Sequence, residues 1–337
     1  MNSKKYFSVI TLAISLLSLS ATAGVIFGSV GNLDGGYRWD ADHYEFNGQE
    51  RSLNDGLRYS MEGGSLINYR DLFTWDVVPT ELDFGATIEL AFNAWKSVDP
   101  VTGLSTSLDF IDDTASTIAV GNGFGSINIF GAEIDLLASD AGDSGTRATS
   151  YFSASSHNVT LTSGTTNYSD SGAIIGADIN INNNSGAVYS LDLFGRLLTH
   201  EIGHALGLGD VDVGYDFIDD NYDVNDPLGT LTNSWGLLVN PLNPAASVGL
   251  SLFSVTKAAV QTQGVDILME SDGLGIASGN PVTNLVPLTN DDYGMRQFLY
   301  PTLSVASVPE PSTVILFILA FTILLKNRMR IFVKNDT

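Results

Sequence analysis

The sequence predicts an α+β fold with α/β character, and three observations support this. Hydrophobic residues make up 44% of the 337 residues and charged residues 16%, as expected for a chain that buries a core. Short alternating apolar segments indicate strands, and three well-separated segments keep a helical period. Strands interspersed with helices in this way favour an α+β or α/β domain.

The first half of the chain is predicted to hold one helix and two strands. Residues 24–66 are rich in Gly, Asp and Asn and have no sustained apolar periodicity, which predicts an extended or hairpin-like lead-in segment. Apolar residues recur at helical spacing over residues 87–98, which predicts an amphipathic helix. Residues 108–111 and 127–136 have the pattern of strands, the second with an irregularity at Gly131.

The second half begins with a polar stretch. Residues 138–172 are dominated by Ser, Thr, Gly, Asp and Asn and are expected to form a surface insertion. Residues 177–182 alternate apolar with polar side chains, which predicts a half-exposed strand. A helical period predicts a helix over residues 191–206, although its two internal glycines each cost about 1 kcal/mol relative to Ala. A last helix is predicted over residues 290–300, capped by Thr289.

The charge balance and the absence of cysteine exclude several kinds of site. Asp and Glu number 38 against 15 Lys and Arg, a formal charge of −23. A surface that binds nucleic-acid phosphates needs clustered cations, so no nucleic-acid partner is expected. The chain has no cysteine, which excludes disulfides, thiolate metal ligands and cysteine nucleophiles. Any metal chemistry must therefore use His and carboxylate ligands.

The N-terminus carries an export signal. A basic pair precedes an apolar stretch over residues 7–19, and a small-residue cleavage pattern follows at residues 21–23. Residues 1–23 are therefore predicted to be a signal peptide for the Sec pathway, with the mature chain beginning at Gly24. The apolar stretch is shorter than the roughly 20 residues that span a bilayer, which disfavours a retained anchor.

The C-terminus carries a second signal. Pro309-Glu310-Pro311 precedes an apolar run over residues 314–325 and a basic tail. A helix of that length rises only about 18 Å, which makes a marginal membrane anchor. The order of these features closely resembles the PEP-CTERM sorting signal of Gram-negative bacteria, here over residues 304–337. The resemblance implies an exosortase-type partner, transient membrane association, and cleavage that releases the protein to the cell surface or extracellular matrix. An uncleaved membrane anchor is the alternative.

The body between these signals is more acidic than the whole chain. The terminal segments hold six of the 15 basic residues and two of the 38 acidic ones, so residues 24–308 keep nine basic and 36 acidic residues, a formal charge of −27. Such a charge favours divalent cations and repels anionic partners.

Candidate catalytic residues are concentrated in one segment, which reads Thr199-His200-Glu201-Ile202-Gly203-His204-Ala205-Leu206-Gly207-Leu208-Gly209-Asp210. Helical residues four apart share a face and lie about 6 Å apart, so His200 and His204 can direct imidazole nitrogens at one cation, a geometry that suits zinc. Glu201 can approach a metal-bound water without being a ligand, as a general base does in metal-assisted hydrolysis. Only four His occur in the chain, and two fall here.

Two imidazoles leave a catalytic zinc site one protein ligand short. Gly207 can adopt a positive φ and end the helix in a sharp turn, which would bring Asp210 back towards the cation. Asp210 is therefore the predicted third ligand, with Asp212 as the substitute. A solvated loop acid and a calcium ligand are the alternatives for Asp210.

This segment resembles the metzincin clan, most closely its matrixin-like members, with the long motif in the form HExxHxxGxxD. The resemblance implies a metzincin-type catalytic domain over residues 67–303, with a twisted mixed sheet, a zinc-binding active-site helix and a C-terminal helix. Further similar segments are residues 91–98 (the family's first helix), 177–181 (its edge strand above the cleft), 266–270 (its Met-turn, with Met269 beneath the zinc site) and 289–300 (its closing helix).

The resemblance implies a zinc metalloendopeptidase. His200, His204 and Asp210 would hold zinc, which lowers the pKa of a bound water and polarises the scissile carbonyl, while Glu201 takes the water proton and passes it to the leaving amine. An extended protein or peptide substrate would pair antiparallel with the edge strand around Ile179. The competing hypothesis is a non-catalytic matrix or adhesion protein that keeps the metal for stability.

The sequence departs from the commoner pattern of the family. Asp in place of a third His adds negative charge, which should make zinc a weaker Lewis acid and lower activity or alter the metal preference. Without cysteine, a cysteine switch cannot provide latency, and a pro-segment role for residues 24–66 stays open. Alternating Asp and Asn over residues 219–225 leave calcium as a further candidate cofactor, with a solvated acidic loop as the alternative, although the Gly and Glu of an EF-hand are missing.

Overall fold

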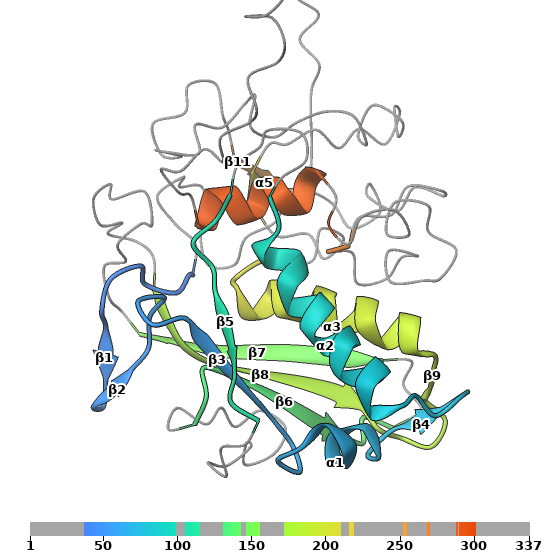
Figure 1. The fold of residues 1–337 in the computed structure, drawn as a ribbon. Coiled ribbons are helices and arrows are strands. Elements are labelled where there is room, and N and C mark those ends of the chain that lie inside the picture. The colour runs from blue at the N-terminus through green and yellow to red at the C-terminus, as the bar shows by residue number, and fades with distance from the viewer. Residues whose placement is uncertain are drawn as a thin grey trace, which may run out of the picture.

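A five-stranded mixed sheet lies beneath two long helices, α2 (Glu81–Lys96) and α3 (Leu191–Ala205) (Figure 1). This computed structural model describes residues 37–98, 105–114, 131–142, 146–155, 172–209, 268–269, 288 and 290–300, and the backbone of residues 216–218 and 252–254. The strands of the sheet are β3 (Leu57–Met61), β5 (Phe110–Asp112), β6 (Ile134–Ser139), β7 (Ala148–Ser155) and β8 (Ala173–Asn182).

The sheet has the strand order β5-β3-β6-β8-β7. The first four strands in that order are mutually parallel, and β7 pairs antiparallel with β8 at one edge. The remaining elements are short pairs of strands and two further helices: β1 (Glu45–Phe46), β2 (Gln49–Glu50), α1 (Leu66–Arg70), β4 (Thr74–Trp75), β9 (Val188–Tyr189), β10 (Asp216–Ile218), β11 (Leu252–Ser254) and α5 (Asn290–Leu299). The chain is thus a mixed α/β structure, as the sequence predicted at that level.

Local capping interactions explain where both helices above the sheet begin. The Thr80 hydroxyl accepts from the N–H of Asp83 and caps α2, which begins six residues before the predicted start at residue 87. The prediction missed this first turn because it relied on apolar spacing, whereas the capping residue precedes the apolar stripe. In α3, the Ser190 hydroxyl accepts from the N–H of Leu193 in the same way. The predicted helix over residues 191–206 is confirmed, with Leu206 as the C-cap.

The predicted exposure and edge position of residues 177–182 were wrong. This segment belongs to β8, which is buried along its whole length and lies between β6 and β7. Its polar side chains are buried as well. One of them, the Asn182 amide, donates to the loop carbonyls of Gly142 and Thr146, 3.2 and 2.8 Å away. Because both neighbouring positions are occupied, a peptide cannot add to the sheet at Ile179.

The predicted surface insertion over residues 138–172 contains the true edge strand, β7. Its side chains are mostly half-buried, as expected for a strand with one neighbour. Its many Ser and Ala residues hid the strand from a prediction based on apolar alternation. The strand predicted over residues 108–111 corresponds to β5, which starts two residues and ends one residue later. The strand predicted over residues 127–136 overlaps β6 at residues 134–136, and its first part, residues 127–130, lies outside the described residues.

The segment before residue 66, whose role the sequence left open, supplies an interior strand of the sheet. β3 pairs with β5 on one side and with β6 on the other. The hairpin of β1 and β2 precedes it. Removing this segment would therefore expose the edges of two other strands. Among the described residues no helix is long and apolar enough to cross a membrane, and both predicted terminal signals lie outside those residues.

An aromatic cluster joins the helices to the small strand pair of β4 and β9. Phe194 of α3 stands at its centre, with ring centroids 5.2 to 5.9 Å from those of Phe73, Trp75, Phe84 and Tyr189. The pairs with Phe73 and Tyr189 meet edge to face, the arrangement that the aromatic quadrupole favours, and the pairs with Trp75 and Phe84 are tilted. The cluster anchors the N-terminal end of α3.

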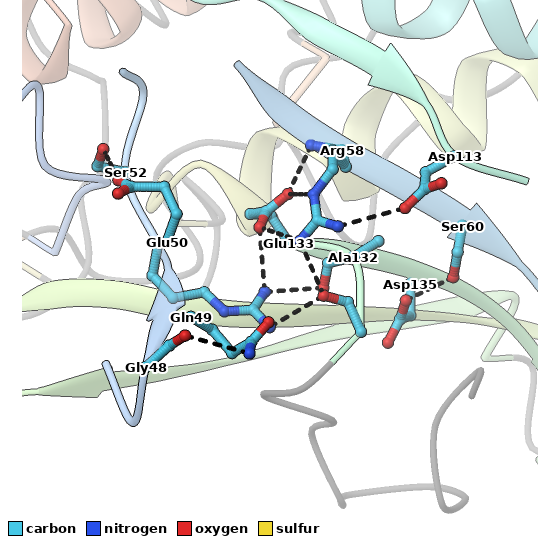
Figure 2. Close-up of polar contacts among 12 residues, drawn as sticks. Gly48, Gln49, Glu50, Ser52, Arg58, Ser60, Asp113, Ala132, Glu133 and Asp135 are labelled. Carbon is cyan, nitrogen blue, oxygen red and sulfur yellow. Dashed lines mark hydrogen bonds and ion pairs between the residues drawn. The ribbon is translucent and has the colours of Figure 1, made fainter. Parts of the chain in front are cut away.

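The face of the sheet turned away from α2 and α3 carries buried charge. The Arg58 guanidinium donates two hydrogen bonds to the Glu133 carboxylate, from Nε to Oε2 at 3.0 Å and from Nη2 to Oε1 at 2.8 Å (Figure 2). Buried Arg51 approaches the same carboxylate at 3.3 Å and also donates to the carbonyls of Gly131 and Ala132. One carboxylate thus serves two guanidinium groups.

Asp135 lies beside this cluster and differs from Glu133 in its protonation, because no arginine donates to its carboxyl group among the described hydrogen bonds. The Ser60 hydroxyl donates to its Oδ1 at 2.6 Å (Figure 2), while its Oδ2 has no hydrogen-bond partner in the described structure. Burial raises the pKa of Asp135 to about 7, although the Ser60 hydrogen bond and the Arg51 charge act in the opposite direction. Asp135 is therefore protonated below neutral pH.

We predict that Asp135→Asn flattens the dependence of stability on pH. Because the pKa is raised in the folded state, the proton on Asp135 stabilises the fold fully at acidic pH, and this contribution is lost as pH rises through about 7. Between pH 5 and pH 8 the wild type should lose about 3 kcal/mol of unfolding free energy that the variant does not lose. Urea unfolding at the two pH values measures this, with exposed Asp42→Asn as the control, and equal slopes for wild type and Asp135→Asn would refute it.

Candidate metal centre on α3

The last two turns of α3 bring His200, Glu201 and His204 into the interior. Their exposed fractions are only 3%, 3% and 8%. The two imidazoles lie on one face of the helix, with ring centroids 4.6 Å apart and planes nearly perpendicular. The i, i+4 spacing predicted this proximity, and the structure brings both rings together as expected.

Backbone carbonyls hold the inner nitrogen of each ring. His200 Nδ1 lies 2.6 Å from the carbonyl oxygen of Leu268, and His204 Nδ1 lies 2.8 Å from that of Leu208. A carbonyl can only accept, so each Nδ1 carries the hydrogen and donates it. In the neutral rings both Nε2 atoms consequently present lone pairs, the tautomer that binds metals through Nε2.

The two Nε2 atoms face each other at 3.0 Å. Two lone pairs at this distance repel, unless a cation lies between them or one ring takes up a second proton. Nitrogens bound to one tetrahedral zinc at 2.0–2.1 Å would be about 3.3 Å apart, so the observed separation is close to what a shared metal ion requires. The donor set, its tautomers and its burial fit a zinc ion.

The absence of a side chain at Gly203 allows the hydrogen bond between His200 and the Leu268 carbonyl. A Cβ on Gly203 would lie 2.4 Å from Met269 Sδ and 2.8 Å from a ring carbon of Trp95. Both neighbours are fully buried, so neither has room to retreat. The bare backbone at this position lets residues 268–269 pack directly on α3, which places the Leu268 carbonyl against His200. A Met-turn over residues 266–270 stays a prediction, because only residues 268–269 are described.

The C-terminus of α3 ends in a Schellman turn. The N–H of Gly207 donates to the carbonyl of His204 at 2.9 Å, and the N–H of Leu208 donates to that of Gly203 at 3.0 Å. Gly207 has φ +95°, as the sequence predicted for a sharp helix end. This turn carries the Leu208 carbonyl to His204.

Side chains from both ends of the described chain cover the remaining carbonyls of this turn. The Trp39 indole donates to the carbonyl of Ala205 at 3.0 Å, and the Tyr300 hydroxyl donates to that of Leu206 at 2.6 Å. The Tyr300 hydroxyl also accepts from the N–H of Trp39 at 3.2 Å. The last turn of α3 is therefore held by a triangle of hydrogen bonds that joins segments 261 residues apart.

Glu201 contacts the edge strand. The Ser150 hydroxyl of β7 lies 2.7 Å from Glu201 Oε2 and 3.0 Å from the Glu201 backbone carbonyl, and it can donate to either. Glu201 thus lies beside the histidine pair with its carboxylate held from β7. Ser150 was not among the predicted site residues, because its segment has the composition of a surface insertion. The sequence did hold one indication: Ser150 and Phe152 are two residues apart in a stretch of strand-forming residues, so they share one face of a strand.

The third predicted ligand lies outside the described residues. This holds for Asp210, for its substitute Asp212, and for the calcium candidates over residues 219–225. Within the described part of the chain, no three His, Asp or Glu side chains converge as a metal-binding group. The structure therefore describes two of the three predicted zinc ligands together with the predicted base.

Comparisons with known proteins add little. No family model matches the chain, and no curated protein matches it. Among solved structures, one similar chain is described as "GM1 bound form of the ECX AB5 holotoxin", with a TM-score of 0.36 and 12% sequence identity over 86% of this chain and 94% of that chain. A TM-score of this size supports no inference about fold or function.

We predict that Gly207→Ala destabilises the protein far more than Gly142→Ala. Both positions have positive φ, which costs a non-glycine residue about 1–2 kcal/mol. A Cβ at Gly207 would in addition lie 2.2 Å from the Tyr37 carbonyl oxygen, whereas a Cβ at Gly142 meets nothing within 4 Å. The Gly207 variant should lose at least about 3 kcal/mol of unfolding free energy in urea titrations. Similar losses in the two variants would show that the clash is relieved without cost.

Proposed function

We propose that this protein is an exported zinc-dependent endopeptidase that hydrolyses peptide bonds of surface or extracellular proteins. One observation carries the proposal: two buried imidazoles, each with its Nδ1 on a backbone carbonyl, turn their Nε2 atoms towards each other at 3.0 Å. Two neutral imidazoles in these tautomers would repel each other at this distance, and a shared metal ion would remove that repulsion. The adjacent carboxylate of Glu201 supplies the base that hydrolysis requires.

His200 and His204 would hold the zinc, with Asp210 proposed as the third ligand. When bound, zinc supplies Lewis acidity, which lowers the pKa of a water molecule and polarises the scissile carbonyl. Glu201 accepts a proton from the attacking water and delivers it to the leaving amine as the C–N bond breaks. Ser150 keeps the Glu201 carboxylate oriented through its hydrogen bond to Oε2.

The edge strand β7 offers a place for an extended substrate. Among the described strands it pairs only with β8, and we propose that a substrate adds to its other edge by strand addition. The contact between Ser150 and Glu201 places this edge beside the proposed base. A peptide added there would run past Glu201. This position for the substrate replaces the one predicted from the sequence, beside Ile179.

The metzincin-type assignment rests on the motif and on the order of the helices and strands. Three of the four further segments that resemble that clan lie in α2, β8 and α5, and the motif lies in α3, although β8 is not the edge strand. The predicted terminal signals support a location outside the cytoplasm and exosortase-type processing of residues 304–337. The competing proposal, a non-catalytic matrix or adhesion protein, differs in having the metal without hydrolysis.

We predict that Glu201→Gln abolishes cleavage and retains metal. Gln has nearly the same shape but cannot accept the proton, so cleavage of an unstructured protein should fall at least a hundredfold. Metal analysis should still find about one zinc per chain, whereas His204→Ala should lose both zinc and cleavage. Cleavage by Glu201→Gln at the wild-type rate would remove Glu201 from the mechanism. Zinc that stabilises wild type without any proteolysis would favour the matrix or adhesion protein.

We predict that Ser150→Ala lowers kcat about tenfold and leaves KM and zinc content unchanged. The substitution removes the hydrogen bond that orients Glu201 but leaves the backbone edge of β7 intact. Ser153→Ala, on the same strand and the opposite face, serves as the control. Ser150→Thr retains a hydroxyl and should recover part of the rate. Equal kinetics for Ser150→Ala and Ser153→Ala would assign Ser150 no positioning role.

A further inference from the structure

A groove separate from the histidine site runs between α2 and β5. It has a volume of ≈ 620 Å³, within the range of roughly 300–1,000 Å³ that ligand sites occupy. None of its lining residues belongs to α3, which carries the histidine pair. We refer to it as the α2–β5 groove.

The groove follows nearly the whole length of α2. Its wall contains Glu81, Gly85, Glu89, Asn93 and Lys96, which recur at intervals of three or four residues and therefore form one stripe of the helix. From the first to the last of these residues the helix rises about 22 Å. A site of this length suits an extended chain of about six or seven residues better than a small molecule.

The floor of the groove is aromatic. The ring of Tyr59 stacks on Phe92 with centroids 4.1 Å apart, and Phe92 packs against Phe110 at 5.0 Å. Tyr59 is 7% exposed, and its hydroxyl has no hydrogen-bond partner among the described residues. Tyr59 is the register partner of Asp112 on β5 and lines the same groove as Glu89. Burial, and then the charges of Asp112 and Glu89, raise the pKa of Tyr59. Leu82 on the rim is 81% exposed and adds an apolar contact surface.

The charge of the groove is uncompensated. Glu81, Glu89 and Asp112 line it, and none has an ion-pair partner in the described part of the chain. The only cation in the lining, Lys96, is paired with Asp109 at 2.5 Å. Three carboxylates, an unpartnered hydroxyl and an apolar rim complement ammonium or guanidinium groups attached to an apolar backbone.

We propose that the α2–β5 groove binds an extended polypeptide segment that carries Lys or Arg at every fourth position with an apolar side chain between them. Glu81 and Glu89 are two helical turns apart, about 12 Å along α2, and residues four apart in an extended chain are separated by about 13 Å on the same side. The carboxylates therefore match the spacing of two basic side chains. This binding is independent of the proposed hydrolysis.

The test uses the peptide acetyl-Gly-Lys-Ser-Leu-Ser-Arg-Gly-amide, labelled for fluorescence anisotropy, and the full-length protein with Glu201→Gln so that the peptide is not consumed. Glu89→Gln and Asp112→Asn should each weaken binding about threefold, and together about tenfold. Tyr59→Phe should weaken it while preserving the ring stack. The exposed control Asp42→Asn removes one charge outside the groove and should leave binding unchanged. A peptide with Gln in place of Lys and Arg should not bind.

Several results would overturn the proposal. Equal weakening by Asp42→Asn and Asp112→Asn would mean that the peptide senses only the overall negative charge. Absence of binding to the parent protein at millimolar peptide would exclude this ligand class. Concentration-dependent dimerisation that Leu82→Lys abolishes would show that a second copy occupies the groove. Each result leaves the zinc and cleavage assays unaffected.

Discussion

The last turn of α3 exposes carbonyl groups that have no partner within the helix, and such groups need donors when they are buried. Trp39 and Tyr300 donate to two of them, and the Schellman turn at Gly207 satisfies two more. The same turn holds one of the two imidazoles, because the His204 partner is the carbonyl of Leu208 within the turn. Fixing these carbonyls therefore also fixes His204, whereas His200 depends on the carbonyl of Leu268. The candidate site depends on segments near both ends of the chain.

Close approach of backbones is the second condition for the site. Gly203 weakens α3 by about 1 kcal/mol relative to Ala when judged by helix propensity alone. In the folded protein, the missing side chain allows Met269 and Trp95 to contact the helix, and the Leu268 carbonyl reaches His200. Gly195 is comparable, since a Cβ there would lie 2.7 Å from Thr87 of α2. Both glycines lower the intrinsic stability of the helix, and both allow close contacts with other parts of the chain that a Cβ atom would prevent.

Negative charge is used in two different ways on either side of the sheet. On the face away from the helices, Glu133 is neutralised by two arginines, and Asp135 keeps its proton because burial penalises the carboxylate. In the α2–β5 groove, the carboxylates stay exposed to solvent and uncompensated. The first arrangement stabilises the fold, whereas the second leaves charge available to a ligand. The acidic composition alone does not distinguish them.

The sequence by itself determined the features that depend on local spacing: the extent of α3, the start of α5, the i, i+4 placement of the two histidines and the helix end at Gly207. Tertiary structure decided the features that depend on distant partners. It made β7 the edge strand, buried the polar face of β8 and placed Ser150 beside Glu201. A period of 2 shows which residues of a strand share a face, but only pairing between strands decides what covers that face. The tautomers of the histidine pair likewise depend on carbonyls, and backbone carbonyls have no signature in the sequence.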